Sequence, residues 1–173
     1  YNNPDYSKDV VYSKVGINFV RSKALNACGI ESNKEGFRKI YISRKTSDYR
    51  QLLNANEIEN LLIALGFEII FPEKISFFAQ VRLFSQAKII VGQGGAGMAN
   101  MIFAPKTCKL LILISDVQQT NLHLFHSIAE SIGVTLEFMT GRHVSIENQY
   151  RRKYNIHADF FIDPKLLLQM LDI

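Results

Sequence analysis

The seven residues KLLILIS, Lys109–Ser115, constrain the fold more than any other stretch of the chain. Residues 110–114 are all aliphatic, so both sides of a strand formed here would be apolar. A strand of this kind must be covered on both faces of its sheet, as central strands of parallel sheets are. The stretch therefore predicts a parallel sheet with helices on both sides.

Helix-like and strand-like patterns alternate along the rest of the chain. We expect helices at 10–28, 54–66, 76–87, 98–104, 121–133 and 162–171. We expect strands at 39–43, 67–72, 88–91, 109–115 and 134–141. This alternation predicts an α/β fold with a doubly wound parallel sheet, formed by one domain, 1–173, in which the polar residues 1–9 are a linker.

Ligands of doubly wound sheets bind where the strands end, near a switch in strand order. The positions to examine are therefore those that directly follow Ser43, Phe71, Val91 and Ser115.

Local signals fix several helix ends. Asn54 and Glu57 have the spacing of a capping box, and Ser76 is placed as an N-cap. Asp163 is expected to cap the last helix, with Pro164 at its first position. The first helix is expected to end at Gly29 and to bury an apolar face made of Val11, Val15, Phe19, Ala24 and Cys28.

Charge and cysteine content narrow the classes of function. The net charge is +4, and the only dense basic run, 151–153, reads as a solvated turn. An anionic small ligand or an anionic membrane surface is then as compatible as nucleic acid, and we expect no nucleic-acid partner. Cys28 and Cys108 lie far apart, which predicts neither a disulfide framework nor a zinc site and fits a cytoplasmic location.

The stretch Gly92–Gly97, GQGGAG, is a literal G-x-G-x-x-G between a strand and a helix, and Asp116 follows nineteen positions after its last glycine. Glycines in such a loop let the backbone approach a phosphate, which the N-terminus of the next helix attracts. A dinucleotide-binding domain of an NAD(P)-dependent oxidoreductase is one interpretation. Against it, Pro105 limits the helix to 98–104, and the loop follows the third strand instead of the first. A tight turn without ligand is a further alternative.

A longer pattern resembles a known family. The segments KIYISRK, the run from Asn54 to Pro105, and HSIAESIGV together resemble the donor-binding half of glycosyltransferase family 61, which includes bacterial capsular-polysaccharide transferases. The resemblance implies an inverting, metal-independent transferase of GT-B type that uses a nucleotide sugar and needs no further cofactor. This chain would be its C-terminal, Rossmann-like domain.

In that arrangement an N-terminal domain, absent from this chain, would bind the glycan acceptor and supply the general base. A chain that begins with Tyr1 fits a piece of a longer protein. The resemblance also allows peripheral association with the inner face of the membrane.

The resemblance assigns roles to several residues. Arg44 would contact the diphosphate, which a planar guanidinium suits. Asn100 would fix the glycine loop or touch the donor. Ser76 and Gln80 match family positions near the nucleotide, although a cap and an exposed helix position explain them equally well. Gly95, Ala96 and Gly97 would present their amides to the phosphate, and Gly94 is counted with them as a donor-binding residue of the loop.

Two positions depart from the family pattern. Gly94 stands where the family usually has histidine, and the strand 109–115 lacks the glutamate that can hold ribose hydroxyls. Asp116 lies close enough in sequence to replace that glutamate. These departures keep a third interpretation open, a degenerate domain that serves assembly without catalysis. If the chain were active alone, its base would have to be Asp116, Glu73 or His143.

Overall fold

The computed structural model describes residues 12–31, 34–117, 122–144 and 158–172. The expected linker at 1–9, the basic run at 151–153 and Val11 lie outside these ranges.

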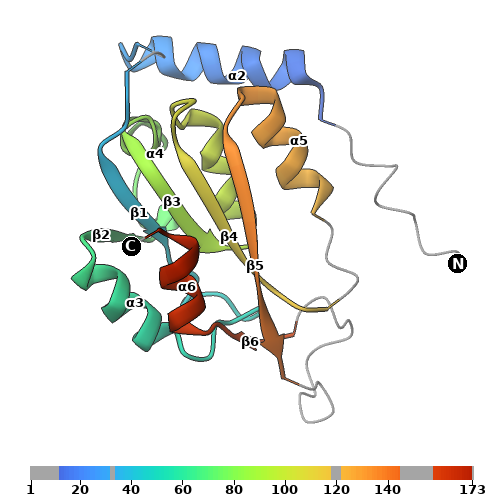
Figure 1. The fold of residues 1–173 in the computed structure, drawn as a ribbon. Helices are drawn as coiled ribbons and strands as arrows, with labels where there is room; N and C mark the ends of the chain where they lie inside the picture. Colours follow the sequence, from blue (N-terminus) through green and yellow to red (C-terminus); the bar gives the residue numbers. More distant parts are fainter. Residues whose placement is uncertain (1–11, 32–33, 118–121, 145–157, 173) are drawn as a thin grey trace, which may run out of the picture.

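One six-stranded sheet forms the centre of the molecule (Figure 1). Its strands lie in the order β2-β1-β3-β4-β5-β6. The first five pair in parallel, and β6 pairs antiparallel with β5. The predicted parallel sheet is confirmed, with strands β1 (Arg38–Ile42), β2 (Phe67–Ile70), β3 (Ala87–Gln93), β4 (Lys109–Ser115), β5 (Thr135–His143) and β6 (Phe160–Phe161).

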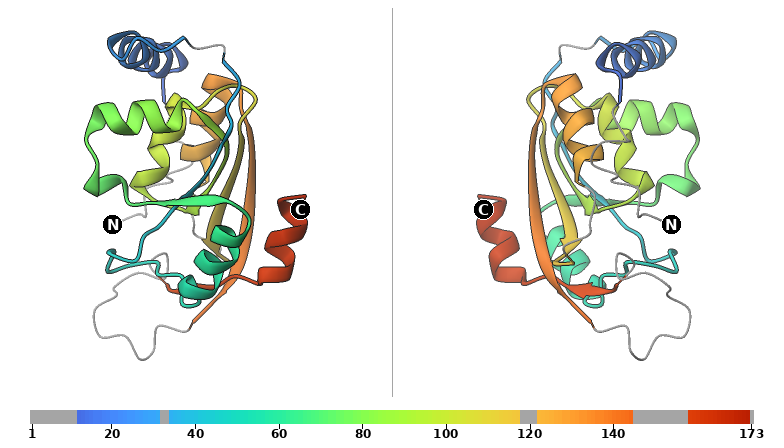
Figure 2. Two further views of the ribbon diagram at one scale, coloured as in Figure 1. Left: turned by 90° about the vertical axis from the view of Figure 1, so that its left-hand side faces the viewer. Right: turned by 90° about the vertical axis from the view of Figure 1, so that its right-hand side faces the viewer.

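Helices cover both faces of this sheet (Figure 2). One core cluster joins the sheet to α2, α4, η2 and α5, and a second joins the opposite face to α3 and α6. The helices are α2 (Lys14–Ala27), α3 (Ala55–Ala64), α4 (Phe77–Phe84), α5 (His123–Ile132) and α6 (Pro164–Met170), with 3-10 helices η1 (Pro72–Lys74) and η2 (Ala96–Phe103).

The strand β4 has the central place that its sequence predicts. It pairs with β3 on one side and β5 on the other. All of its residues from 110 to 115 are buried. Side chains of both parities are apolar because each face of the strand meets a helix layer, with Leu110 in one core cluster and Leu111 in the other.

The strand order reverses between β1 and β3. After β1 the chain enters α3 on one face, and after β3 it enters η2 on the other, although the two strands are neighbours. The loops that leave their carboxyl ends therefore diverge, and the space between them is where open α/β sheets bind ligands.

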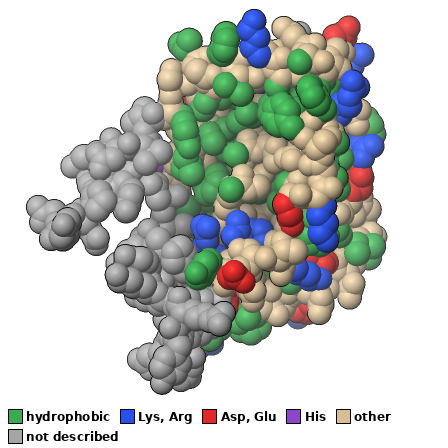
Figure 3. All heavy atoms as spheres, turned by 180° about the vertical axis from the view of Figure 1, so that it is seen from behind, with side chains coloured by type: hydrophobic (Ala, Val, Ile, Leu, Met, Phe, Trp, Pro, Cys, Tyr) green, Lys and Arg blue, Asp and Glu red, His purple; other side chains and the backbone are tan. Residues whose placement is uncertain are grey.

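The apolar face expected for the first helix is wrong in its N-terminal part. Val15 and Phe19 are 80% and 62% exposed, whereas Arg21, Ala24 and Leu25 are buried. The helix packs on α4, η2 and α5 instead of on the sheet, so it buries only a narrow stripe near its C-terminal end. Seen from behind the view of Figure 1, hydrophobic side chains gather on the upper part of the surface (Figure 3).

The capping box predicted at Asn54 is also wrong. The Asn54 side chain makes no cap hydrogen bond and instead exchanges two bonds with the backbone of Ile162. Asn54 Nδ2 also donates to Glu57 Oε2 at 3.0 Å, so these two residues contact each other through their side chains and not through the backbone bonds of a capping box. The N-caps Ser76 and Asp163 are confirmed, because their side chains accept from Ala79 N and Lys165 N.

Candidate functional site

At the carboxyl edge of the sheet, a side chain from the loop after β1 reaches the loop after β3. Arg44 follows β1 by two residues, and its guanidinium lies against Gly95. A Cβ atom at position 95 would stand 1.7 Å from Arg44 Nη1. Gly95 has φ 171°, which any residue adopts, so space and not backbone conformation requires glycine here.

Arg44 is only lightly bonded for a half-buried guanidinium. Its Nη2 donates to Ser47 Oγ at 2.8 Å, while its Nε is buried and has no hydrogen-bond partner. Burial lowers the pKa of Arg44, and the nearby charge of Arg50 lowers it further, whereas Glu73 raises it. The group stays charged, because an arginine pKa lies far above neutrality.

Arg50 repeats the features of Arg44. Its Nε is also buried without a partner, and burial lowers its pKa. Its φ of 56° lies in the left-handed region, which residues other than glycine seldom occupy. Neither Arg44 nor Arg50 forms an ion pair with a carboxylate among the described residues. Two half-buried cations that repel each other form a site ready for an anion.

Residues from the far end of the chain hold this loop in place. The buried Asp159 accepts from Gln51 N at 2.6 Å, and Phe160 exchanges backbone hydrogen bonds with Gln51 and Leu53. Asn54 adds its two bonds to Ile162. These contacts fix the backbone on the C-terminal side of Arg50.

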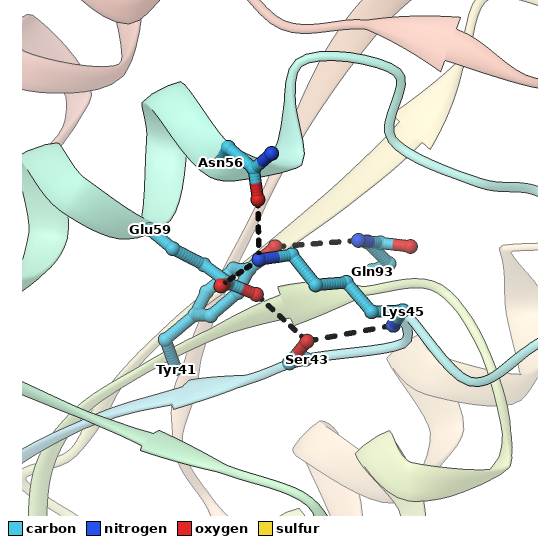
Figure 4. Close-up of polar contacts among 6 residues, drawn as sticks. All are labelled: Tyr41, Ser43, Lys45, Asn56, Glu59 and Gln93. Atoms are coloured by element: carbon cyan, nitrogen blue, oxygen red, sulfur yellow. Dashed lines mark hydrogen bonds and ion pairs between the residues drawn. The ribbon is translucent and has the colours of Figure 1, made fainter.

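A buried carboxylate holds the other side of the loop (Figure 4). Glu59, on α3, accepts from Ser43 Oγ at 2.8 Å and pairs with Lys45. Lys45 Nζ also donates to Asn56 Oδ1 at 2.8 Å. Ser43 and Lys45 are the two neighbours of Arg44, so Glu59 sets the path of the backbone that carries the arginine.

A cavity of about 90 Å³ opens beside Arg44. Gln93, the last residue of β3, is 2% exposed and forms part of its wall. Gln93 Nε2 donates to Tyr41 Oη at 3.3 Å, while Gln93 Oε1 is buried without a partner. The lining consists of Arg44, Lys45, Gln51, Leu52, Ala55 and Gln93.

The glycine loop presents backbone N–H groups beside Arg44. Gly94 and Gly95 are buried, Ala96 is exposed and Gly97 is half-buried. The short helix after the loop is a 3-10 helix whose first bond runs from Met98 N to Gly95 O. The N–H groups of Ala96 and Gly97 precede that bond, and such groups are the ones that bind anions.

Asn100, Ser76 and Gln80 are bonded to their own surroundings. Asn100 Nδ2 donates to Gly97 O at 3.2 Å, which holds the glycine loop. Ser76 caps α4. Gln80 Nε2 donates to the carbonyls of Pro72 and Ile75, which ties η1 to α4.

Asp116 is not joined to this group. It lies one residue past β4, and its Oδ1 accepts from His143 N at 2.9 Å and lies 2.6 Å from His143 Nδ1. These hydrogen bonds lower the pKa of Asp116. The pair stands at the end of β4 and β5, and both side chains are close to half exposed, 47% for Asp116 and 45% for His143.

Other candidate chemistries have ordinary explanations. Cys28 and Cys108 are both free and buried, and burial raises the pKa of Cys108 to about 12. The His126 ring packs 5.0 Å from the Phe138 ring. Among the described residues no group of three His, Cys, Asp or Glu side chains could hold a metal ion. No helix in the described ranges is long and apolar enough to span a bilayer.

Sequence reasoning missed Arg50, Glu59 and Gln93. Arg50 sits in a loop with no periodicity, and Glu59 lies within a helix pattern that charged residues usually expose. On β3, Gln93 points to the same face as Ile89 and Val91, which are buried and apolar. Gln93 is the polar residue of this series. A polar residue inside an apolar alternation was the signal that could have found it.

Comparison with known proteins gives one family match. The family model described as Glycosyltransferase 61 matches residues 4–111, a range that contains Arg44, Arg50 and the glycine loop but ends before Asp116. The EGF domain-specific O-linked N-acetylglucosamine transferase of Rattus norvegicus is 30% identical over 80 residues. Those of Pan troglodytes and Gallus gallus are also 30% identical over 80 residues. The aligned part is 43% of this chain and 15% of each relative.

Proposed function

The chain belongs to the glycosyltransferase 61 family, and from that premise we propose that it binds the diphosphate of a nucleotide-sugar donor. The observation that carries the proposal is the pair of half-buried arginines, Arg44 and Arg50, each with an unpartnered Nε. Arg44 lies against Gly95 of the glycine loop, and Arg50 is close enough to Arg44 for its charge to lower the pKa of Arg44. The charges of a diphosphate would offset the repulsion between these arginines and satisfy their free donors.

The same groups have a role in sugar transfer. An acceptor hydroxyl oxygen forms a bond to the anomeric carbon while the bond from that carbon to the diphosphate oxygen breaks. The electron pair leaves with the nucleoside diphosphate, and the hydroxyl proton passes to a general base. Arg44, Arg50 and the amides of Ala96 and Gly97 would stabilise the charge that develops on the leaving group.

The acceptor side of the reaction belongs to the proposal as well. The stretch aligned with the curated relatives makes up only 15% of each of them. We propose that a further domain supplies the general base and binds the acceptor. The two domains would both be Rossmann-like and would be arranged as in a GT-B enzyme. The relatives' name points to N-acetylglucosamine as the sugar and to a protein acceptor, and a surface polysaccharide is the alternative acceptor.

The test is calorimetric titration of UDP and GDP into the wild type and Arg44→Ala. The substitution is expected to weaken nucleoside diphosphate binding by about 1.5–3 kcal/mol, the scale of a charge-assisted hydrogen bond. Uridine should bind no differently to the two proteins. Arg82→Ala, an exposed arginine on α4, is the matched control and should bind as the wild type does.

Three results would contradict the proposal in different ways. Equal losses for UDP and uridine would remove Arg44 from the phosphate site. Stabilisation of the wild type by NAD but by neither diphosphate would favour the oxidoreductase interpretation. Stabilisation by none of the three would favour a domain that serves assembly.

A further inference from the structure

The side chain of Gln93 is unusual for its place in the sheet. Ile89 and Val91 point to the same face of β3 and are buried among apolar neighbours. A residue of the same shape without polar atoms would continue this pattern. Gln93 instead buries a carbonyl oxygen with no partner, which raises the free energy of the folded chain.

Tyr41 orients the Gln93 amide. Tyr41 is fully buried on β1, and its Oη accepts from Gln93 Nε2 at 3.3 Å. Burial raises the pKa of Tyr41 to about 12, so the phenol remains protonated. The Gln93 side chain lines the cavity, and with its Nε2 bonded to the phenol its Oε1 is left as a buried acceptor without a partner.

The rest of the cavity lining includes both charged and apolar side chains. Arg44 and Lys45 supply positive charge, and Lys45 is held by Glu59 and Asn56 (Figure 4). Leu52 and Ala55 are buried and apolar. A volume of about 90 Å³ is several times what one water needs, so it has room for a compact group of a few heavy atoms.

We propose that this cavity receives an N–H or O–H group of the same molecule whose phosphate Arg44 holds, and that Gln93 Oε1 accepts its hydrogen bond. The inference rests on the proposed function, because Arg44 lines both the cavity and the phosphate site. An imide N–H of a nucleobase and a hydroxyl or amide N–H of the sugar share this chemistry. Gln93 is then a residue that selects the donor.

The experiment compares Gln93→Met with the wild type in calorimetric titrations of inorganic pyrophosphate, UDP, UDP-glucose and UDP-N-acetylglucosamine. Methionine keeps the length of the side chain and removes the acceptor. Binding of at least one nucleotide ligand is expected to weaken roughly 3- to 12-fold, the value of one net hydrogen bond. Pyrophosphate binding should not change, because it carries neither base nor sugar.

The pattern of losses identifies the group. Equal losses for UDP and the UDP-sugars place it on the nucleoside, and losses confined to one or both UDP-sugars place it on the sugar. Gln86→Met is the matched control, because Gln86 stands just before the opposite end of β3 and its side chain accepts from Arg38 Nε. It should bind all four probes as the wild type does.

Two outcomes overturn the inference, and they are distinguishable. If the wild type binds a UDP ligand and Gln93→Met binds it equally well, the cavity role falls while the proposed function stands. If the wild type binds none of the probes, both fall. Should Gln93→Met not fold, the double variant Tyr41→Phe with Gln93→Met removes both hydrogen-bonding partners, which is close to neutral for stability, and it replaces the single variant in the same titrations.

Discussion

At the carboxyl edge of the sheet, polar groups at the β4/β5 end and at the β1/β3 end differ in burial and in hydrogen bonding. At the β4/β5 end, Asp116 and His143 bond to each other and are open to solvent. At the β1/β3 end, Arg44, Arg50 and Gln93 are more deeply buried and each keeps an atom without a partner. Both ends carry charged side chains, so charge alone does not distinguish them.

The difference favours the β1/β3 end as the place where a ligand would bind. A bonded pair in solvent lowers the free energy of the folded chain by itself, although only slightly. Buried groups without partners raise it, and a fold retains them where a ligand supplies the missing bonds. The two ends should therefore respond to substitution in opposite ways, with losses of binding at the β1/β3 end and losses of stability at the β4/β5 end.

Gly95→Ala should have the largest effect and would separate the two ends most sharply. The new Cβ would stand 1.7 Å from Arg44 Nη1, the flexible end of a side chain that can swing into solvent. Nucleoside diphosphate binding is then expected to weaken by at least the ~1.5–3 kcal/mol predicted for the loss of Arg44. The midpoint of unfolding without ligand should hardly change, and titration calorimetry with denaturation measures both.

The control for this variant is Gly16→Ala. A Cβ at Gly16, in the first turn of α2, meets only Ser13 at an ordinary 3.6 Å. The same substitution there should leave binding unchanged and should stabilise the helix slightly. If Gly95→Ala unfolds readily but still binds UDP normally, the β1/β3 end is a structural turn and the comparison fails.

Glu59→Ala should have the next largest effect. It tests the hydrogen bonds that hold the backbone on both sides of Arg44. It removes the partner of Ser43 Oγ and Lys45, and a lost buried acceptor costs on the order of 1–3 kcal/mol of unfolding free energy. Because Ser43 and Lys45 flank Arg44, UDP binding should weaken too. Glu59→Gln retains an acceptor for Ser43 and should recover part of both losses.

Denaturant unfolding of the two Glu59 variants measures the loss of stability, and UDP titration measures the loss of binding. A binding loss in Glu59→Ala without any loss of stability would mean that Glu59 contacts the ligand directly. A loss of stability with normal binding would mean that the loop keeps its path without the carboxylate.

The sequence predicts the β1/β3 end only in part. Periodicity and strand order bring the residues after β1 and β3 to one edge, which is why Arg44 and the glycine loop could be paired in advance. Arg50 could not be found, since its place depends on bonds from Asp159 and Phe160, more than a hundred residues away. Asn54 shows the same limit, because its side chain bonds to the backbone of Ile162 and to the Glu57 side chain and does not cap α3.

Asp116 tests the β4/β5 end, where the effect should be smallest. Asp116→Asn is expected to lower the free energy of unfolding at pH 7 by less than about 1 kcal/mol, because its contact with His143 is close to half exposed. UDP binding should not change, because Asp116 bonds to β5 and not to the glycine loop. Arg142→Ala, an exposed substitution on the same strand, is the control.

The pH dependence gives the sign of this last effect. The bonds from His143 lower the pKa of Asp116 in the folded chain below its ordinary value of about 3.9. The unfolded state therefore binds a proton first as the pH falls, so the stabilisation by Asp116 is complete above about pH 4 and is lost as the pH falls through the lowered pKa. The difference between wild type and Asp116→Asn should shrink in denaturant titrations as the pH falls below about 4. A difference that persists at low pH would show that Asp116 stabilises this end by packing and not by its charge.

Weaker UDP binding in Asp116→Asn at pH 7 would show that the β1/β3 end and the β4/β5 end form one site, and the contrast between them would then no longer hold.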